Sequence, residues 1–576
     1  MEPTINPALQ PTNTPIPAQQ IQYPYHRPVN KTIPSLSHET YFAFISIILG
    51  YFYCRMNRIT GNIGIGTTIY QIVLCIFTAM YLKKAKGCKQ NATSIFMLIS
   101  SLLFALYFMI FNGEAESVVS FFGFNICYII WVAASSGCIL HSKKSSYIGY
   151  NLGRSAFAIP FGECGNGIKT ASDIKKKHVL KRASAVLIGI LLTIPLAAVI
   201  LLLLGSADAL FGQLMRPLLH ILPNIDEYFI LNNLRCIILG IPVGLYLCGL
   251  VIGHSRVARM NLCRKEAGDD NEAALDKAAA AHFYPDFTDI ANTVELKKLK
   301  DYTKTAAADL DAKAAKKRLI PSVTLITMLT VLNAIYAVFL TIQFPVISAA
   351  FSNYLPENMT YAEYARSGFF QLFAVAMINL FVIIAVMMLH KELTGRAFKV
   401  LRIENTVLCL FTIGLSVTAF RRMYLYISVY GLTRLRVYTS LFMIYLIIVF
   451  AACIIRQFKE YNAAGFSTAV GVVFALFFVF GNIDSNIAAY NLHAVEAGTL
   501  EAHGVVTALE GSGAMVQIAD YESRLTAEGT PEDDPLLSEL RYRLTYAHSD
   551  IKRSEEFDIQ SYALNKKIEA FRKQHP

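Results

Sequence analysis

The apolar and polar positions of this chain alternate in long blocks. Eleven apolar stretches, most of them 18 to 25 residues long, run between Tyr41 and Gly481. A helix of about 20 apolar residues spans the roughly 30 Å hydrocarbon core of a bilayer, because each residue adds about 1.5 Å. The pattern therefore predicts an all-α, polytopic integral membrane bundle with about 11 transmembrane helices and a small helical C-terminal appendage.

The predicted spans vary in strength. The first is the weakest, because its uninterrupted apolar run from Tyr41 to Cys54 is short for a bilayer crossing and needs a tilted neighbour or local thinning. We place the spans at 38–55, 63–82, 93–111, 117–140, 183–205, 232–253, 319–343, 369–390, 403–420, 437–455 and 464–481.

These spans divide the chain into seven parts. The first 40 residues are polar and hold eight of the 20 prolines, so they predict a disordered leader and no cleavable signal peptide. The parts are the leader (1–37), a four-helix membrane part (38–140), a cytoplasmic loop (141–182), a transmembrane pair (183–253), a cytoplasmic insert (254–318), a five-helix membrane part (319–481) and an acidic helical tail (482–576).

The distribution of lysine and arginine predicts the orientation. With the N-terminus in the cytoplasm, the cytoplasmic segments carry 34 of these residues and the opposite loops carry 9. Positively charged loops are retained in the cytoplasm. An odd number of spans then places the C-terminal tail outside the cell membrane.

Composition agrees with a membrane protein and argues against several other classes. The chain is 54% apolar with a mean hydropathy of +0.43, above what a soluble chain of this length carries. The 11 cysteines form no Cys-x-x-Cys pair, so neither a disulfide framework nor a zinc module is predicted. Phosphate loops, zinc-protease motifs, nucleophile elbows and dinucleotide fingerprints are absent from the sequence. We therefore predict no catalytic residues and no cofactor, and a lipid bilayer in place of nucleic acid as partner.

The C-terminal tail differs from the rest of the chain. Residues 482–576 hold 16 acidic and 9 basic residues, a net −7 beside +18 elsewhere. Segments 536–546 and 554–573 have helical patterns, and the pairs Thr530–Pro531 and Asp534–Pro535 predict a break. The tail is a candidate surface for a protein partner.

Charged residues close to a predicted span give the first candidate site. Glu363 and Arg366 are three residues apart at the entry to span eight, so a helix would place them on one face, within reach of an ion pair. One interpretation is an interfacial belt in which Tyr361 and Tyr364 orient the helix. The other is a gate or ligand-binding pair that faces the exterior.

The segment from 421 to 436 is the second candidate site. It carries four arginines in a loop that the charge rule places outside, against the positive-inside tendency. Three interpretations remain open: an interfacial or re-entrant helix, an anion-binding pocket, or a local topology opposite to the one assigned. The candidate functional residues are Arg422, Tyr426, Tyr430 and Arg436.

Other polar residues near span ends are weaker candidates. Asp208 follows a very apolar span and predicts a turn or helix cap. Glu404 begins span nine behind Arg402, which predicts a first-turn salt bridge. Three histidines at span ends allow a proton relay or metal site, although interfacial histidines are common; they are His141, His254 and His390. The glycine pairs Gly64/Gly66 and Gly240/Gly244 predict close helix packing.

Four motifs carry a family resemblance. They are the stretch from Tyr361 to Gln371, the stretch from Arg422 to Arg436, the turn Ser206–Phe211 and the stretch from Asn482 to Asn491. Together they resemble the bacterial membrane family called domain of unknown function 4173, with the related 4153 group. The resemblance covers roughly residues 150 to 510 and implies a multi-spanning fold and a membrane location, without a known reaction.

Two classes of function follow. Many spans, prolines inside spans such as Pro195 and Pro242, and polar groups near the exterior favour transport or permeation in the cell envelope. The alternative is a sensory, regulatory or assembly protein that acts through its tail and cytoplasmic insert. An intramembrane enzyme acting on a lipid-linked substrate has only the 421–436 segment in its favour.

Overall fold

The described part of the chain is entirely helical. The computed structural model describes residues 37–57, 63–85, 87–139, 148–163, 227–267, 322–352, 369–389, 396–459, 461–547 and 556–575. These residues form helices and no strand. The predicted all-α class is therefore confirmed for this part of the protein.

Eight of the described helices are long and apolar enough to cross a membrane. They are α2 (Ile65–Lys84), α3 (Ala92–Ile110), α4 (Glu114–Ser135), α9 (Glu227–Ala267), α13 (Ser322–Ser352), α16 (Arg396–Tyr430), α17 (Arg434–Phe458) and α18 (Ala463–Phe480). In addition, α15 (Phe369–Leu389) contains a shorter apolar segment, Leu372–Val386. Helix α1 (Ser37–Met56) coincides with the weak first span, and the predicted span 183–205 lies outside the described residues. The count of about 11 spans stays a prediction.

The first group of helices, which we call the N-terminal bundle, consists of α1–α4 and α9. Its core is rich in aromatic side chains, among them the fully buried Phe108 and Trp131. Helices α1 and α9 cross closely at the predicted glycine pair. A Cβ atom at Gly240 would lie 2.7 Å from the Cα of Tyr51, and one at Gly244 would lie 2.6 Å from the carbonyl oxygen of Ser46. The close packing predicted for Gly240 and Gly244 is confirmed.

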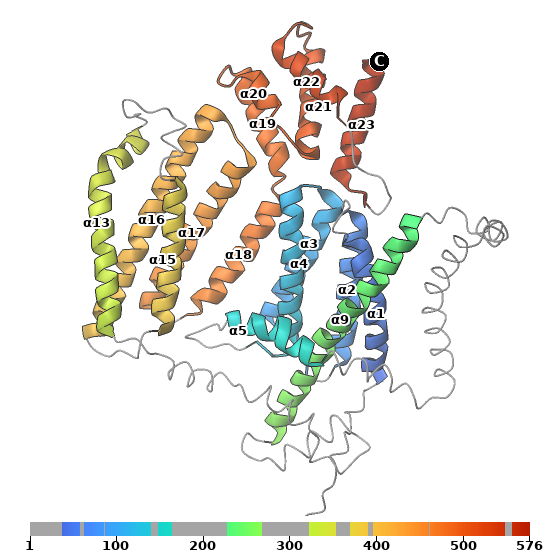
Figure 1. Ribbon diagram of the computed structural model, residues 1–576, viewed down its shortest axis with the longest axis vertical. Coiled ribbons are helices and arrows are strands. Elements are labelled where there is room, and N and C mark those ends of the chain that lie inside the picture. The colour runs from blue at the N-terminus through green and yellow to red at the C-terminus, as the bar shows by residue number, and fades with distance from the viewer. Residues whose placement is uncertain are drawn as a thin grey trace, which may run out of the picture.

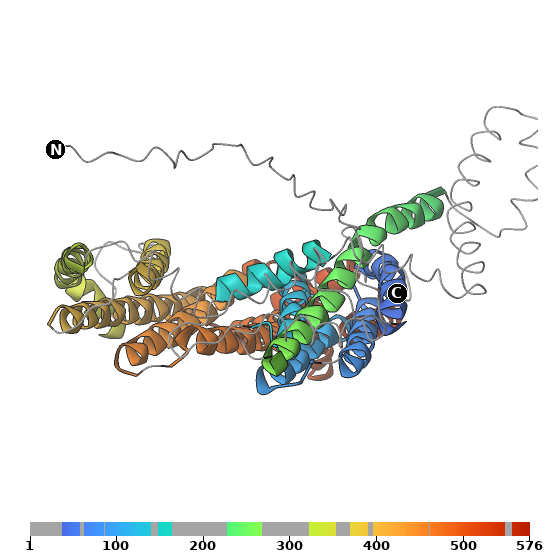
Figure 2. The same cartoon turned by 90° about the horizontal axis from the view of Figure 1, so that it is seen from below.

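The second group, the C-terminal bundle, consists of α13, α15, α16 and α17 around a separate apolar core. Helix α18 lies between the two bundles and contacts α3, α4 and α17 (Figure 1). Seen from below, the helices form an elongated slab (Figure 2). The outer faces stay apolar and exposed, as at Phe381 of α15 and Phe477 of α18, which is the surface that a bilayer would cover.

Several helices extend beyond the predicted spans. Helix α16 runs for 35 residues and ends ten residues beyond the predicted span end at 420, and α17 begins at Arg434, three residues before the predicted span start at 437. Helix α9 continues past the predicted end at 253 to Ala267. The predicted loop 141–182 contains a helix over residues 148–163, in which α5 (Ile148–Gly153) continues through a π-helical turn (Arg154–Ala158). The predicted spans end at the first polar residues. The helices continue beyond those residues, because their backbone hydrogen bonds persist where the polar side chains find partners.

Side-chain caps explain where several helices begin. Asn91 accepts a hydrogen bond from the backbone N–H of Ser94 and forms a reciprocal capping box at the start of α3. Asn462 caps α18 through the N–H of Gly465. The first turn of a helix leaves backbone donors without helical partners, and these amide oxygens satisfy one donor in each case.

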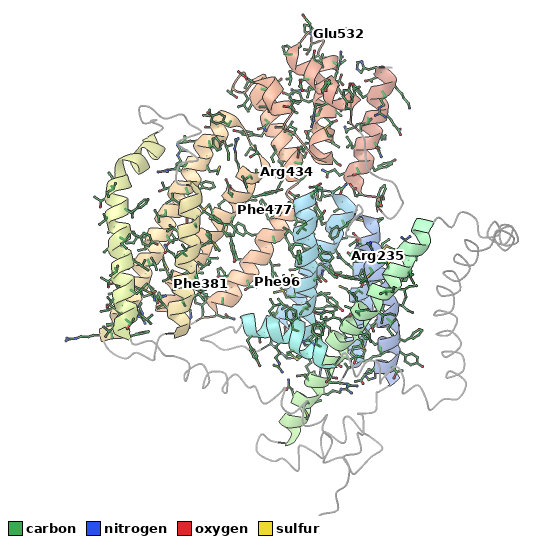
Figure 3. All side chains as sticks on the ribbon, viewed as in Figure 1. Phe96, Arg235, Phe381, Arg434, Phe477 and Glu532 are labelled. Atoms are coloured by element: carbon green, nitrogen blue, oxygen red, sulfur yellow. The ribbon has the colours of Figure 1, made fainter. Side chains whose placement is uncertain are left out.

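The tail forms a compact helical unit that we call the tail module. It contains α19 (Ile483–Glu496), α20 (Ala502–Val506), α21 (Ser512–Ala527), α22 (Pro535–Thr545) and α23 (Ile559–Gln574) around its own apolar core. Helices α22 and α23 coincide with the two predicted tail helices. The module covers the end of the slab where α2, α4 and α17 begin (Figure 1). Glu532 marks its far end in Figure 3.

Candidate functional site

The structure brings four of the predicted site residues together. Arg422, Tyr426 and Tyr430 lie on the last turns of α16, and Arg436 lies on the first turn of α17. Glu363, Arg366 and Asp208 lie outside the described residues, so their roles stay predictions.

Arg436 stabilises the end of α16. Its guanidinium lies 4.0 Å above the centre of the Tyr426 ring and donates hydrogen bonds to the carbonyl oxygens of Tyr430, at 2.8 Å, and Gly431. A cation at a helix C-terminus is favourable because the last carbonyls have no helical donors. Gly431 has a φ of +73° and ends the helix in the left-handed conformation. Arg436 therefore has a local structural role.

The segment from 421 to 436 is therefore not a separate re-entrant helix. Residues 421–430 continue α16, a three-residue turn follows, and α17 begins at Arg434. Arg422 is almost fully buried, and the guanidinium of Arg421 lies 5.0 Å from the centre of the Tyr424 ring. Tyr424 and Tyr430 are exposed, as an interfacial helix face requires, whereas Tyr426 is buried.

Arg434 joins the C-terminal bundle to the tail module. Its Nε and Nη2 atoms donate to the two carboxylate oxygens of Asp484 at 2.6 and 2.9 Å, and Glu510 lies 3.5 Å from Nη1. Figure 3 shows Arg434 at the junction of α17 and the tail. A planar guanidinium matches a carboxylate in this two-bond geometry. The sequence analysis did not predict this pair. The signal for it was the net negative charge of the tail beside the net positive charge of the rest of the chain.

The tail module also grips the turn between α16 and α17. Asn491 of α19 accepts a hydrogen bond from the N–H of Leu432 at 2.7 Å and donates one to its carbonyl oxygen at 2.9 Å. Leu432 and Val437 pack against the apolar core of the module. The turn and the tail module therefore form one packed unit.

The same tail module contacts the N-terminal bundle. The N–H of Ile65, at the start of α2, donates to the carbonyl oxygen of Phe557 at 2.9 Å. At the end of α3, Asn112 donates to the Ser561 hydroxyl at 3.4 Å. Between the two bundles, Tyr438 of α17 donates to Glu116 of α4 at 2.9 Å. The module thus bridges both bundles at one end of the slab.

Asp558 caps α23 at this junction. One carboxylate oxygen accepts a hydrogen bond from the N–H of Ser561 at 2.7 Å, while the other is buried with no hydrogen-bond partner among the described residues. Burial raises the pKa of the Asp558 carboxyl above its usual value, against the opposing effect of the backbone and side-chain hydrogen bonds.

A polar site lies inside the C-terminal bundle, between α13 and α16. The Glu404 carboxylate accepts a hydrogen bond from Asn333 Nδ2 at 2.6 Å, and its other oxygen lies 2.9 Å from the Thr330 hydroxyl. Asn333 Nδ2 also donates to the Glu404 backbone oxygen at 3.1 Å. Asn333 lies ten and nine residues from the ends of the apolar window Val323–Ile342, which is roughly 14–15 Å from each end at 1.5 Å per residue. The carboxylate therefore contacts α13 near the middle of its apolar window, while Glu404 itself is the ninth residue of α16.

A second polar layer lies further along α16. Tyr336 of α13 donates to Asn379 Oδ1 of α15 at 2.7 Å, and Asn379 Nδ2 donates to the Thr412 hydroxyl of α16 at 2.9 Å. Asn379 and Thr412 have no exposed surface. Ser416, one turn beyond Thr412, is also buried. One face of α16 thus carries polar groups in successive layers through an apolar bundle.

The salt bridge predicted between Glu404 and Arg402 is wrong. The Arg402 guanidinium lies over the rings of Phe398 and Phe458, at 4.7 and 5.8 Å. Among the described residues, Glu404 forms no ion pair and is held by uncharged donors. Residues two positions apart in a helix point to nearly opposite faces, so Arg402 packs toward Phe458 of α17 and Glu404 toward Asn333 of α13.

A buried ion cluster lies in the N-terminal bundle. Arg256 of α9 donates to Glu39 of α1 at 3.2 Å and to Glu163 at 3.0 Å, and Arg259 also pairs with Glu39. All four side chains are at least nine-tenths buried, and their charges balance. The sequence analysis missed the cluster, because Glu39 and Arg256 are 217 positions apart. Its one signal was the presence of charged residues beside predicted spans.

The histidine relay finds no support in the described residues. His254 is fully buried in α9, where Nδ1 lies 2.6 Å from the carbonyl oxygen of Leu250. His141 and His390 lie outside the described residues, so the relay itself stays untested. Within the described ranges, no three His, Cys, Asp or Glu side chains group as metal ligands.

Comparison with known proteins gives one match. The family model described as domain of unknown function (DUF4153) matches residues 72–515, more than three quarters of the chain. The expected 4173 assignment is not confirmed, whereas the related 4153 group is shown. No curated protein and no solved structure matches the chain.

Proposed function

We propose that this chain, which belongs to the DUF4153 family, functions in the transport or permeation of a solute across the membrane through the C-terminal bundle. Polar groups inside that bundle support the proposal. The observation that carries the proposal is the Glu404 carboxylate, which Asn333 and Thr330 hold against the apolar window of α13 without a counter-charge among the described residues. An ionised side chain at this depth costs about 2.5–3.5 kcal/mol on insertion scales, so such residues mark functional positions.

The second polar layer supports the same function. Asn379, Tyr336 and Thr412 come from three different helices and meet inside the bundle. A bundle made only for packing would use apolar side chains here, because each buried polar group must find a partner. Polar groups in layers along one helix provide the successive contacts that a polar solute needs.

We further propose that the tail module faces the exterior and that Glu404 lies nearer the cytoplasmic half of α16. The lysine and arginine distribution supports this orientation. The arginines near 421–436, which run against the rule, have partners of their own. Arg434 pairs with tail carboxylates, and Arg436 binds helix carbonyls. Because these partners neutralise the arginines locally, the arginines contribute less to retaining the segment in the cytoplasm.

Reconstitution into liposomes tests the proposal. Purified protein is placed in vesicles that contain a pH-sensitive dye, and ion movement is driven by a potassium diffusion potential. We expect flux in vesicles with the wild-type protein and its loss in the Glu404→Gln variant, which keeps the size of the side chain but removes its charge. The Asn379→Ala variant should lower the flux.

The matched control is Glu569→Gln, the same chemical change at an exposed carboxylate of α23. It should leave flux unchanged. Equal flux in protein-free and wild-type vesicles across a panel of ions and small solutes would overturn the transport proposal. Equal flux in the wild type and Glu404→Gln would remove the C-terminal bundle as the route.

A regulatory or assembly function is the second candidate, and the bridging position of the tail module favours it. The module contacts α17, the α16–α17 turn, α2 and α3, so movement of the module would be felt in both bundles. Arg434→Gln should release the module while both bundles stay folded. A co-purifying partner that is lost with this variant, together with absent flux in the wild type, would favour this function over transport.

A further inference from the structure

The hydrogen bonds around Glu404 accommodate both an ionised and a protonated carboxyl. The ionised form accepts one hydrogen bond from Asn333 Nδ2 at 2.6 Å and one from the Thr330 hydroxyl at 2.9 Å. Each carboxylate oxygen therefore has a donor. This arrangement offsets part of the cost of placing the charge in an apolar bundle.

The Thr330 hydroxyl has a second partner. Its oxygen also lies 2.9 Å from the backbone oxygen of Ile326, one turn earlier in α13. A hydroxyl has one proton and can donate to only one of these two acceptors. When it donates to Ile326, its lone pair faces Glu404 and can accept a hydrogen bond from a protonated carboxyl. Rotation of this hydroxyl exchanges the two arrangements without moving a helix.

Asn333 remains a donor in both arrangements. Its two amide protons are directed to the Glu404 backbone oxygen and to one carboxylate oxygen. An amide N–H facing a carboxylate occupies a position that a metal ion would need and repels the cation. The donor set around Glu404 therefore suits a proton better than Na⁺ or another metal cation.

Among the described residues, the Glu404 carboxyl has no charged partner. The described residues of α13 and α15 carry no charged side chain, and the titratable group nearest along α13 is Tyr336, which donates to Asn379. On α16, the guanidinium of Arg402 lies over aromatic rings. In the part of the chain that the structure describes, no lysine or arginine forms an ion pair with Glu404, although Arg396 and Lys399 lie on the same helix. A proton is thus the positive charge that can neutralise this group.

Glu404 is also accessible. Its side chain is half-buried, and Thr330 lies on the exposed face of α13, the peripheral helix of the bundle (Figure 1). This exposed face is part of the outer surface that a bilayer would cover, so a reagent dissolved in the bilayer can reach the carboxyl.

We infer that Glu404 is a proton-binding site in the membrane, at which the carboxyl takes up one proton, donates it as a hydrogen bond to Thr330, and releases it again. In the uptake step the carboxylate oxygen forms the new O–H bond with a proton from water, and the Thr330 hydroxyl turns its own proton to Ile326. This inference rests on the proposed function, because it names the proton as the ion that the route handles.

Labelling with a bilayer-permeable carbodiimide tests the inference in the full chain. The protonated carboxyl adds to the reagent and rearranges to a stable N-acylurea, so the Glu404 peptide gains the mass of the whole reagent. We expect labelling of this peptide in the wild type and its loss in Glu404→Gln. Above the pH of half-labelling, the label should fall about tenfold for each further pH unit, as the protonated fraction does.

Variants of the donor residues distinguish a proton site from a structural hydrogen bond. Asn333→Leu removes a donor to the ionised form, so half-labelling should move to higher pH. Thr330→Ser keeps the hydroxyl and should label like the wild type. The emission of Trp131, the single tryptophan, buried in the N-terminal bundle, verifies that each variant keeps that bundle folded.

Each outcome separates the inference from the transport proposal. Absent label at every pH, or a label independent of pH, would overturn the proton site whether or not flux is found. Protection by Na⁺ in place of choline would overturn it in favour of a sodium site. Labelling that follows pH beside absent flux would keep the proton site and overturn transport.

Discussion

Replacing Glu39 by glutamine tests the buried ion cluster of the N-terminal bundle. Glu39 is 1% exposed, and its two carboxylate oxygens receive Arg256 and Arg259. The wild-type cluster holds two arginines and two glutamates, so the variant leaves one positive charge in excess in a buried place. Breaking a buried ion pair by removing one partner costs about 3–5 kcal/mol. We expect the free energy of unfolding of the bundle to fall by that amount.

The assay uses the single tryptophan. Trp131 is fully buried in the same bundle, so its emission reports unfolding during a denaturant titration of the detergent-solubilised protein. The double variant Glu39→Leu/Arg259→Met removes one ion pair completely and leaves Arg256 paired with Glu163. Apolar replacement of a buried pair is often close to neutral, so this variant should recover at least about 1–2 kcal/mol of the loss.

A surface pair provides the matched control. Asp520 pairs with Lys567 on the tail module, where the aspartate is exposed and the lysine is about one-third exposed. The Asp520→Asn variant should cost less than about 1 kcal/mol, because water screens exposed ion pairs. A loss of under about 1 kcal/mol for Glu39→Gln, or a double variant no more stable than the single one, would refute the reasoning.

Three further predictions concern the junctions between parts. Arg434→Lys should weaken the attachment of the tail module by about 1–2 kcal/mol, nearly as much as Arg434→Gln, because an ammonium cannot form the two parallel bonds to Asp484. The rate of protease cleavage in the tail measures this loss. A lysine variant as resistant as the wild type would contradict the prediction. Asp558→Asn should stabilise α23 at neutral pH. Burial raises the folded-state pKa of Asp558, so the folded tail gains stability as pH falls through that pKa, and the advantage of asparagine should vanish in acid. Hydrogen exchange of α23 at two pH values checks the sign, and equal protection at neutral pH would refute it. Gly240→Val should separate α1 from α9, because a Cβ there would lie 2.7 Å from the Cα of Tyr51. Unchanged Trp131 emission together with an unchanged melting temperature would contradict this prediction.

The sequence by itself determined that this protein is built from helices of membrane length. Long apolar blocks predicted helices of membrane length, because an isolated helix satisfies its own backbone hydrogen bonds in hydrocarbon. Local signals were also sufficient for the close approach at Gly240 and Gly244, and for the start of α22, where Asp534 accepts hydrogen bonds from the backbone N–H groups of Leu536 and Leu537 and Pro535 follows it. Each of these depends on residues within a few positions of one another.

Only the tertiary structure decided which polar groups meet. Glu404 lay beside Arg402 in the sequence, yet packing places it against Asn333, 71 positions away, in the middle of a span. In the sequence, Arg434 is a cation in a segment that the charge rule places outside. In the folded protein it pairs with Asp484 of the tail module, 50 positions later. Hydropathy records the cost of a buried charge but carries no information about its partner, because partners are set by helix packing over long sequence separations. The candidate site therefore moved from the helix end at 421–436 to the interior of the C-terminal bundle.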